Sequence, residues 1–271
     1  MGNHIAITFI AIQPEQQELV IANLADAGYE GFEEKETELK AFVPEAAYEP
    51  SLLKELASKY QLTYSVQTIA AQNWNAVWES NFQPVVVDDF VAVRAHFHEA
   101  AKGVEHEIVI TPKMSFGTGH HATTFMMMQQ MRNIDFRNKT VFDFGTGTGV
   151  LAILAEKLGA EKILAVDNDD WSIENAAENF SRNSCVAIAL EKADTAAARE
   201  SFDIILANIN KNVILDNMVV LAGQVVPGGT LLLSGLLRED EKDIITCADK
   251  QMLVFAGRVE KDNWLCLRFV R

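Results

Sequence analysis

The first seventy residues alternate apolar strands with two helical patterns. Ile5, Ile7 and Phe9 occupy every second position, which predicts a strand with one buried face. Pro14 and Gly28 are the start and stop signals of a helix. The remaining elements expected in this part are strands at 30–36, 38–43 and 62–66 and a helix from Pro44. This order of strands and helices fits a small ferredoxin-like α+β domain.

From residue 85 onward the pattern changes to a repeated strand–helix alternation. Short apolar runs separated by helical segments indicate a doubly wound parallel sheet. The expected strands are 85–87, 90–93, 107–110, 141–144, 163–166, 186–190, 204–207 and 230–233. The expected helices are 123–132, 150–158, 171–182 and 212–225. Two further strands, 252–257 and 265–270, are joined by a short polar turn and put an antiparallel edge on the sheet.

The change of pattern divides the chain into two domains. The expected boundaries are a small domain at 1–70, a helical linker at 71–83 and an α/β domain with a Rossmann-like, seven-stranded sheet at 84–271. Trp74 and Trp78 lie four residues apart and therefore share one helix stripe in the linker. We expect them to pack against a neighbouring domain rather than to bind a ligand.

Charge narrows the range of partners. The formal net charge is −15, whereas a protein that binds free nucleic acid needs a basic footprint. An acidic surface suits a small molecule or a basic protein, although it also serves solubility alone. Residues 1–70 carry eleven carboxylates against four lysines and contain no catalytic constellation. This part is either a handle for a basic macromolecule or, around 33–38, simply a solvated hairpin.

Apolar stretches and cysteines indicate the compartment. No apolar stretch approaches the roughly 20 residues that a membrane span needs, and the N-terminus lacks the pattern of a signal peptide. Cys185, Cys247 and Cys266 are scattered, without the spacing of disulfide pairs or of a metal site. We therefore expect a cytoplasmic monomer with free thiols, no bound metal and no membrane partner.

A glycine-rich loop follows the first strand of the large sheet. Gly145, Gly147 and Gly149 let the backbone turn tightly and approach a ligand closely. A dinucleotide-binding loop has the spacing G-x-G-x-x-G and places a pyrophosphate at the helix N-terminus. Here Val150 stands where the third glycine of that spacing belongs, and Asp143 before the loop is unfavourable beside a pyrophosphate. No lysine in P-loop spacing follows, so a nucleoside triphosphate is disfavoured as well.

S-adenosylmethionine accounts for both departures. This cofactor has no phosphates and carries an amino group and a sulfonium that an aspartate favours, so Asp143, Gly145 and Gly147 are expected at its site. The antiparallel edge agrees, because it separates methyltransferase sheets from plain dinucleotide-binding folds. Asp167 lies about where a carboxylate binds the ribose hydroxyls, with capping of the next helix as its alternative role. Asp194 is a candidate to accept a hydrogen bond from the adenine amine. The alternative, that it is a loop aspartate without a binding role, is equally favoured.

The fourth strand brings Asn208, Ile209 and Asn210 to the same sheet edge. Methyltransferases that act on planar amines carry Asn/Asp-Pro-Pro-aromatic here, and the aromatic ring stacks on the base or amide. Ile209, Asn210 and Lys211 provide no such ring, while Asn208 still offers a carbonyl oxygen to an amine. We therefore expect an aliphatic amine as methyl acceptor, with Asn208 as the catalytic residue.

A second glycine-rich stretch, from Phe116 to Thr124, precedes the first strand of the large sheet. Its glycines permit close approach, and its threonines offer hydroxyls. His120 and His121 are too few and too close together for a metal site. Capping or packing is the expected role of each histidine, with catalysis as the alternative.

These stretches together resemble the bacterial ribosomal protein methyltransferases of the PrmA type. The most specific segment reads F-G-T-G-x-H-x-T-T at 116–124, followed by the segments 143–149 and 207–209. The likeness covers most of the chain. It departs from the family's pattern at Ala122, where proline is usual, and at Asn210, where leucine is usual.

The resemblance implies both a cofactor site and a substrate. It implies that Thr124, Gly145, Asp167 and Asn208 contact S-adenosylmethionine. It also implies methylation of lysine ε-amines and of the N-terminal α-amine of a basic protein, number eleven of the large ribosomal subunit. The N-terminal domain would then recognise this substrate, in keeping with its acidity.

Two other functions stay open at this point. One is a nicotinamide-dependent oxidoreductase, against which Asp143 and the loop spacing count. The other is a protein that binds S-adenosylmethionine without transferring a methyl group. A nucleic-acid methyltransferase is disfavoured by the charge and by Ile209. For amine methylation we expect no dedicated general base, because burial beside a sulfonium lowers the pKa of the amine.

Overall fold

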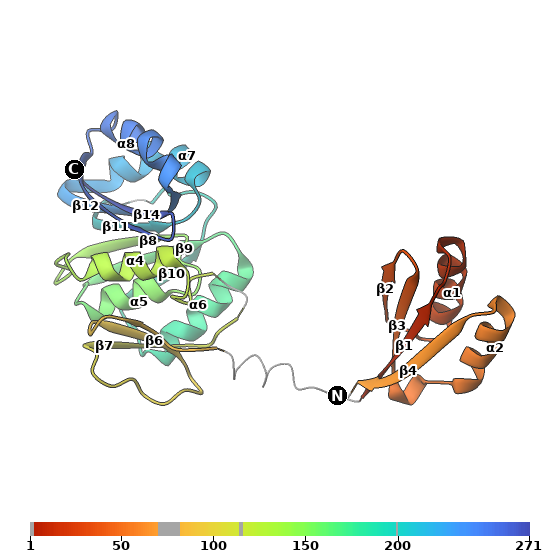
Figure 1. The fold of residues 1–271 in the computed structure, drawn as a ribbon. Helices are drawn as coiled ribbons and strands as arrows, with labels where there is room; N and C mark the ends of the chain where they lie inside the picture. Colours follow the sequence, from red (N-terminus) through yellow and green to blue (C-terminus); the bar gives the residue numbers. More distant parts are fainter. Residues whose placement is uncertain (1–2, 70–81, 114–115, 199) are drawn as a thin grey trace. The chain divides into compact units, whose positions relative to one another are not determined.

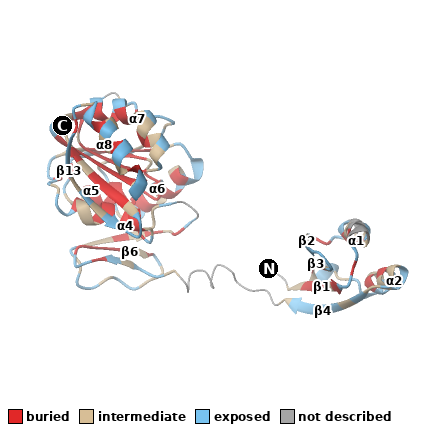
Figure 2. Ribbon diagram, turned by 45° about the horizontal axis from the view of Figure 1, so that its top comes forward, coloured by how far each residue is buried: buried red, intermediate tan, exposed pale blue. Residues whose placement is uncertain are grey.

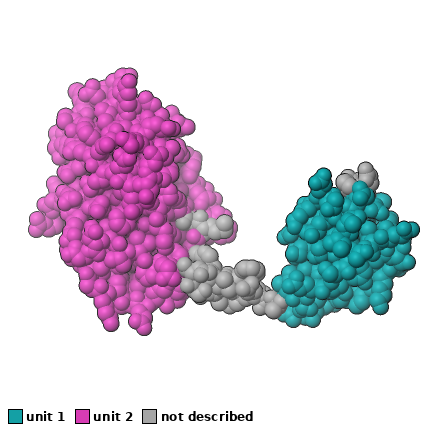
Figure 3. Space-filling model, viewed as in Figure 1, with its two compact units in different colours: residues 1–81 teal, residues 82–271 magenta. Residues whose placement is uncertain are grey.

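The computed structural model describes residues 3–69, 82–113, 116–198 and 200–271. The chain divides into two compact units, Met1–Asn81 and Phe82–Arg271 (Figure 3). Each unit has a hydrophobic core of its own. The linker predicted at 71–83, with Trp74 and Trp78, lies outside the described residues except for its last two positions.

The first unit is a four-stranded antiparallel sheet with two helices (Figure 1). Its elements are β1 (His4–Ile10), α1 (Pro14–Asp26), β2 (Gly31–Lys35), β3 (Glu38–Pro44), α2 (Pro50–Tyr60) and β4 (Thr63–Ile69). The strand order β2-β3-β1-β4 is that of the predicted ferredoxin-like domain. Ile5, Ile7 and Phe9, the alternating apolar positions of β1, are buried in its core.

The second helix of this unit begins at Pro50, so the prediction of a helix from Pro44 is wrong. Pro44 is the last residue of β3, and a 3-10 turn, Glu45–Ala47, follows it. Both prolines fix φ and lack an N–H group, so either suits the start of a helix. The helix that starts at Pro50 places Leu53 and Leu56 in the core.

The second unit is built on a seven-stranded sheet. Its strands are β8 (Thr140–Phe144), β9 (Lys162–Asp167), β10 (Ile188–Lys192), β11 (Phe202–Asn208), β12 (Val225–Leu237), β13 (Val254–Lys261) and β14 (Trp264–Val270). The order is β10-β9-β8-β11-β12-β14-β13, with β14 antiparallel to both of its neighbours. The predicted Rossmann-like sheet with an antiparallel edge is confirmed. Because the strand order reverses between β8 and β11, the carboxyl ends of these two strands open a crevice.

Helices cover both faces of this sheet (Figures 1 and 2). They are α4 (Ala122–Met131), α5 (Val150–Lys157), α6 (Asp170–Arg182), α7 (Lys211–Gln224) and α8 (Glu241–Asp249). Buried residues of α4, α5 and α6 share one core with one face of the sheet, and those of α7 and α8 share another core with the opposite face. A small sheet packs on the outer side of α4, α5 and α6; its strands are β5 (Val85–Val87), β6 (Val91–Ala95) and β7 (His106–Ile110).

Several elements of this unit differ from the prediction, among them β10, α8 and β13, which spans Val254–Lys261 instead of 252–257. The strand expected at 186–190 begins two residues later, at Ile188, and Val186 is 94% exposed. Val186 is apolar, and its apolar character placed it in the predicted strand. Apolar residues also occur on protein surfaces, so this one did not mark a buried strand position. Helix α8 was not predicted; it is a short helix of 9 residues whose buried residues are Ile244 and Ala248.

The structure also describes the cysteines and the helix lengths. Cys185, Cys247 and Cys266 are free thiols, and Cys266 is buried in the core. Among the helices that the structure describes, none combines the length and apolarity that crossing a membrane requires. Within the described ranges, no cluster of three or more His, Cys, Asp or Glu side chains is suited to a metal ion.

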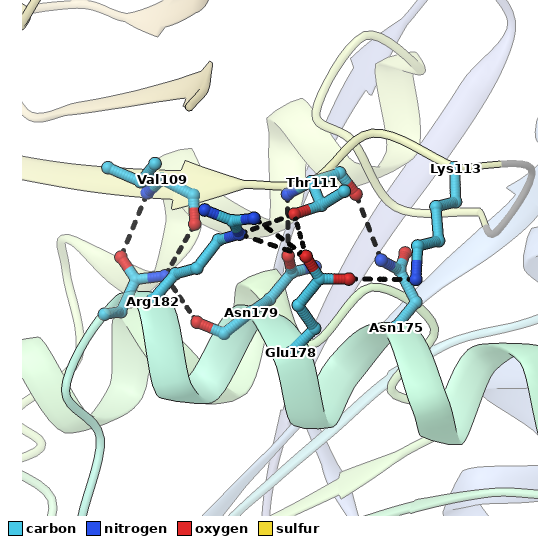
Figure 4. Close-up of polar contacts among 8 residues, drawn as sticks. Val109, Thr111, Lys113, Asn175, Glu178, Asn179 and Arg182 are labelled. Atoms are coloured by element: carbon cyan, nitrogen blue, oxygen red, sulfur yellow. Dashed lines mark hydrogen bonds and ion pairs between the residues drawn. The ribbon is translucent and has the colours of Figure 1, made fainter. Parts of the chain in front are cut away.

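Two asparagines of α6, and a third that follows its last residue, bind the edge strand β7 and the residue after that strand (Figure 4). Asn183 accepts from the N–H of Val109 at 3.0 Å and donates to its carbonyl at 2.7 Å. Asn179 accepts from the N–H of Thr111 at 2.8 Å, and Asn175 donates to its carbonyl at 3.0 Å. Asn179 and Asn183 are four residues apart on the helix side, a rise of about 6 Å, and their partners Thr111 and Val109 are two residues apart on the strand side, a rise of about 6.6 Å. The two spacings match, so each asparagine meets its own strand residue. These amides therefore pair an edge strand as a neighbouring strand would.

Glu178 lies among these asparagines and forms a small ion-pair network (Figure 4). Its carboxylate accepts from Lys113 at 2.9 Å, from the hydroxyl of Thr111 at 2.6 Å and from Arg182 at 2.9 Å. These partners, Lys113 first among them, lower the pKa of Glu178 to about 2. The network fixes the start of the segment that leads from β7 to Phe116.

Replacing Glu178 should make the stability of the protein less dependent on pH. Because its folded-state pKa is depressed, Glu178 stabilises above pH 4.5, and this contribution is lost as the pH falls towards 2. In Glu178→Gln the free energy of unfolding at pH 7 should fall by about 1 kcal/mol, since the group is partly exposed. Urea unfolding followed by circular dichroism at pH 7, 5 and 3 measures the difference.

Glu174→Gln is the matched control, because Glu174 is exposed on the same helix and forms no ion pair among the described residues. It should change the stability little at any of these pH values. A deficit of Glu178→Gln that stays the same from pH 7 to pH 3 would contradict the role of its charge.

Candidate active site

The glycine loop joins β8 to α5 and is shaped by contacts that admit no side chain. Gly145, Gly147 and Gly149 have φ values of 78°, 55° and 80°, which favour glycine. A Cβ atom at Gly145 would overlap the side chain of Ile209, and one at Gly147 would overlap the carbonyl oxygen of Phe116. The loop, the segment at Phe116 and the end of β11 therefore converge on one place in the crevice.

A cavity of about 360 Å³ opens at this convergence. It lies at the carboxyl ends of four parallel strands, where ligands of doubly wound sheets bind. Five of the predicted site residues line it, namely Gly145, Gly147, Asp167, Asp194 and Asn208. The structure thus brings most of the predicted cofactor site together, whereas Thr124 and Asp143 do not line the cavity.

Asp167 both lines the cavity and holds the glycine loop. Its Oδ2 atom accepts from the N–H of Gly147 at 2.9 Å, and its Oδ1 atom accepts from the N–H of Asp169 at 3.1 Å. The alternative role as a helix cap falls to Asp169, which accepts from the N–H of Ser172 at 2.9 Å. A carboxylate has further acceptor sites, so Asp167 retains the capacity to bind hydroxyl groups in the cavity.

Asp143 is fully buried below the loop. Its Oδ2 atom accepts from the hydroxyl of Thr146 at 2.7 Å, while Oδ1 has no hydrogen-bond partner among the described residues. Burial, followed by the nearby charge of Asp167, raises the pKa of Asp143 to about 7. A carboxylate in this position is ready to ionise when a positive charge enters the cavity beside it.

Thr124 reaches the site through Asn208. The hydroxyl of Thr124 accepts from Nδ2 of Asn208 at 3.1 Å, and both side chains are buried. This bond fixes the orientation of the amide. The Oδ1 atom of Asn208 is then left buried without a hydrogen-bond partner in the described part of the chain, which is costly unless a bound group donates to it.

A second cavity of about 310 Å³ adjoins the first. Both are lined by Phe116, Asn208, Ile209 and Asn210, so Asn208 lies where the two meet. Trp264, at the start of β14, lines the second cavity and was missed in the sequence, because it lies far along the chain in no recognisable motif. Pairing of β14 with β12 carries it to the site.

The two neighbouring histidines hold the local structure. His120 lies 3.0 Å from the hydroxyl of Thr118 through Nδ1 and 2.9 Å from the carbonyl of Gln83 through Nε2. His121 caps α4, because its Nδ1 atom accepts from the N–H of Thr123 at 3.3 Å. The expected packing and capping roles are confirmed. Since Nδ1 is the acceptor, the proton of the neutral His121 ring is on Nε2.

Both departures from the family's pattern have local explanations. Asn210 caps α7, since its side chain accepts from the N–H of Val213 at 3.2 Å, and it also lines both cavities. Ala122 is the first residue of α4, the position that proline favours but alanine also accepts. Neither departure disturbs Asn208 or the glycine loop.

The fold and the site define the class of protein. A Rossmann-like sheet ends in an antiparallel β13–β14 edge, and its switch point holds a glycine loop with a buried carboxylate below it. The cavity that the loop lines carries the acidic side chains Asp167 and Asp194. These features are those of an S-adenosylmethionine-dependent methyltransferase of class I.

Comparison with known proteins identifies the family. The model of the ribosomal protein L11 methyltransferase (PrmA) family matches residues 5–271, and the chain belongs to this family. The protein called ribosomal protein L11 methyltransferase in Porphyromonas gingivalis is 40% identical over 260 residues, which cover 93% of this chain and 90% of that protein. The protein of the same name in Chlorobaculum tepidum is 39% identical over 276 residues, with coverages of 97% and 95%.

A solved structure is similar as well. The ribosomal protein L11 methylase of Lactobacillus delbrueckii subsp. bulgaricus is 28% identical, with a TM-score of 0.65. The match covers 70% of this chain and 99% of that one. Family membership makes the chain an enzyme that transfers methyl groups, so neither the nicotinamide-dependent oxidoreductase nor the non-catalytic binding protein applies.

The residues present fit S-adenosylmethionine, the cofactor of this class. The loop approaches a ligand without β-carbons at Gly145 and Gly147, and no phosphate-binding lysine lines the cavity. Asp143, Asp167 and Asp194 give this end of the sheet a negative potential that suits a cationic ligand. The chain's own residues therefore favour a cofactor with a positive charge and no phosphate.

The charge of Asp143 should matter most for the cationic form of the cofactor. Asp143→Asn keeps an acceptor for Thr146 but removes the charge. At pH 8, where Asp143 ionises, the variant should bind S-adenosylmethionine roughly 5-fold more weakly, on the order of 1 kcal/mol. Its affinity for S-adenosylhomocysteine, whose sulfur is neutral, should change less. Isothermal titration calorimetry with both ligands measures the two effects.

The effect should also depend on pH. Below pH 6 the carboxyl of Asp143 is protonated, so the affinities of variant and wild type should converge. Asp203→Asn is a suitable control, since Asp203 is bound to Thr140 at the opposite end of the sheet. Equal weakening of both ligands at every pH would instead mean that Asp143 only supports the loop.

Proposed function

We propose that this enzyme transfers methyl groups from S-adenosylmethionine to ribosomal protein L11, at lysine ε-amines and at the N-terminal α-amine. The names of its relatives support the protein substrate. The observation that carries the chemistry is the buried amide oxygen of Asn208, which has no hydrogen-bond partner among the residues that the structure describes and lies where the two cavities meet. It is placed to accept from an amine that enters through the second cavity.

We assign the first cavity to the cofactor. Gly145 and Gly147 present their backbone to it, Asp167 is proposed to bind the ribose hydroxyls, and Asp194 the adenine amine. Thr124 is proposed to act through its bond to Asn208. When bound, S-adenosylmethionine supplies a methyl group on a positively charged sulfur.

The second cavity suits the apolar stem of a lysine. Its wall carries the aromatic rings of Phe116 and Trp264, with His121 between them at centroid distances of 5.2 Å and 4.7 Å. Such rings pack against the methylene groups of a lysine stem. Ile209 offers no stacking face for a planar base, which supports an aliphatic amine over a nucleobase.

The amine has to be neutral before it can attack. Deprotonating a solvated lysine, of pKa about 10.4, costs ~4.6 kcal/mol at pH 7. The apolar second cavity and a neighbouring positive charge both lower that pKa. His121 is not suited to take the proton, because its Nδ1 atom already accepts from a backbone N–H. The residues therefore position and desolvate the amine, and Asn208 orients its lone pair.

The proposal also covers substrate recognition, cellular location and oligomeric state. The first unit is proposed to recognise the substrate, since residues 1–70 carry a large excess of carboxylates and ribosomal proteins are basic. A ribosomal substrate and three free thiols support a cytoplasmic location. We propose that the enzyme works as a monomer and without free nucleic acid, in keeping with its net charge of −15.

Purified L11 is the direct test of the function. Incubation with S-adenosylmethionine should raise the intact mass of L11 in steps of one methyl group, and peptide mapping should place the groups on lysines and the N-terminus. L11 with its amines acetylated beforehand is the control and should gain nothing. Methylation of ribosomal RNA in place of L11 would overturn the proposal.

Asn208→Ala should slow methyl transfer while the affinity for the cofactor changes little. We expect kcat on L11 to fall on the order of 100-fold, because the amine loses the acceptor that orients it. The dissociation constant for S-adenosylhomocysteine should stay within about 3-fold, measured by calorimetry. Full turnover by the variant at saturating cofactor would remove Asn208 from the catalytic role.

The matched control for this variant is Asn217→Ala. Asn217 lies on α7 and also bonds through both ends of its amide, to the N–H of Ala196 and the carbonyl of Val213. It lines neither cavity. This variant should lower the melting temperature while kcat stays close to that of the wild type.

A further inference from the structure

The segment at Phe116 is bound to the glycine loop through Thr148. The backbone N–H of Thr148 donates to the carbonyl of Phe116 at 3.0 Å, and its hydroxyl donates to the carbonyl of Gly117 at 2.8 Å. The fit is tight on both sides. A Cβ atom at Gly117 would lie 2.9 Å from the Thr148 hydroxyl, and one at Gly147 would overlap the carbonyl oxygen of Phe116.

Asn179 completes this arrangement from α6. Its Nδ2 atom donates to the carbonyl of Thr148 at 2.8 Å, and its Oδ1 atom accepts from the N–H of Thr111 at 2.8 Å. Asn179 and Thr148 are both 0% exposed. One buried amide therefore joins the glycine loop to the start of the segment that carries Phe116.

Phe116 depends on these bonds for its position. Its side chain is 54% exposed, yet it lines both the cofactor cavity and the second cavity. Apart from its contact with His121, at 5.2 Å between ring centroids, a half-exposed ring has little packing to hold it, so its place depends on the backbone that Thr148 binds. A shift of that backbone would change the shape of both cavities at the point where they meet.

We propose that Thr148 and Asn179 are positioning residues for methyl transfer, because together they fix Phe116 against the glycine loop. The assignments of the first cavity to the cofactor and of the second to the amine both rest on the proposed function. Neither residue lines a cavity, so each acts on the reaction only through Phe116 and the loop.

Thr148→Val is the sharpest variant, since it keeps the shape of the side chain and removes only the hydroxyl. Losing one buried hydrogen bond should weaken binding of S-adenosylhomocysteine roughly 3- to 10-fold, measured by calorimetry. The KM for L11 should rise by a similar factor, while kcat at saturation changes less. Thr148→Ser restores the hydroxyl and should recover both constants.

Thr246→Val is the matched control for the lost hydroxyl. Thr246 lies on α8, and its hydroxyl donates to the carbonyl of Lys242 at 2.7 Å, away from both cavities. Its removal should leave the dissociation constant and KM unchanged. The comparison separates the loss of a hydroxyl-to-carbonyl bond in general from the loss of this one.

A second pair of variants tests Asn179. In Asn179→Asp the side chain still accepts from the N–H of Thr111 but no longer donates to Thr148. Asn183→Asp makes the same change four residues later, at the C-terminal cap of α6, where the lost donations go to Val109 and Asn179 and not to the glycine loop. Both should lower the melting temperature, but only Asn179→Asp should also weaken binding of S-adenosylhomocysteine, roughly 3- to 10-fold.

The outcomes separate the two proposals. If Thr148→Val binds S-adenosylhomocysteine as the wild type does, or if Asn183→Asp weakens binding as much as Asn179→Asp, the positioning role is wrong. The positioning role is also wrong if the melting temperature of Thr148→Val falls while its dissociation constant for S-adenosylhomocysteine and its KM for L11 stay unchanged. If the wild type leaves L11 unmethylated, the proposed function fails, while the calorimetric comparison of the variants still decides the positioning role.

Discussion

The close approach of three chain segments at the glycine loop is the contact on which this site depends. Gly145 meets the end of β11 at Ile209, and Gly147 meets the carbonyl of Phe116. A β-carbon at either glycine would separate these segments and with them the walls of both cavities. The rest of the molecule supports this contact: the parallel strands deliver the segments to one edge, and α6 holds the loop and the segment after β7 through Asn179.

The carboxyl groups beside the glycine loop favour a cationic ligand over an anionic one. The carboxyl of Asp143 is buried at the switch point of the sheet, with a pKa raised by burial to about 7. A cationic ligand offsets the cost of ionising it, whereas a pyrophosphate would add to that cost. Asp167 lines the cavity and also holds the backbone of Gly147, so the charge and the shape of the site depend on each other. This coupling explains why a sheet related to dinucleotide-binding folds suits S-adenosylmethionine.

Asn208 lies where the two cavities meet. Thr124 accepts from one end of its amide, and the buried oxygen at the other end has no hydrogen-bond partner among the described residues. The aromatic lining around Trp264 favours an aliphatic stem, and His121 is occupied as a helix cap. Activation of the amine by desolvation and position, without a side-chain base, is consistent with these surroundings.

The amino-acid sequence determined the two-part organisation, the ferredoxin-like and Rossmann-like patterns and most of the cofactor site, because periodicity and glycine spacing are local signals. It misplaced the start of α2, since Pro44 and Pro50 are equivalent locally and only core packing distinguishes them. Tertiary structure alone decided that Asp143 is buried below the glycine loop and that Trp264 lines the second cavity. Both depend on strand pairing between residues far apart in the chain, and no local pattern records that pairing.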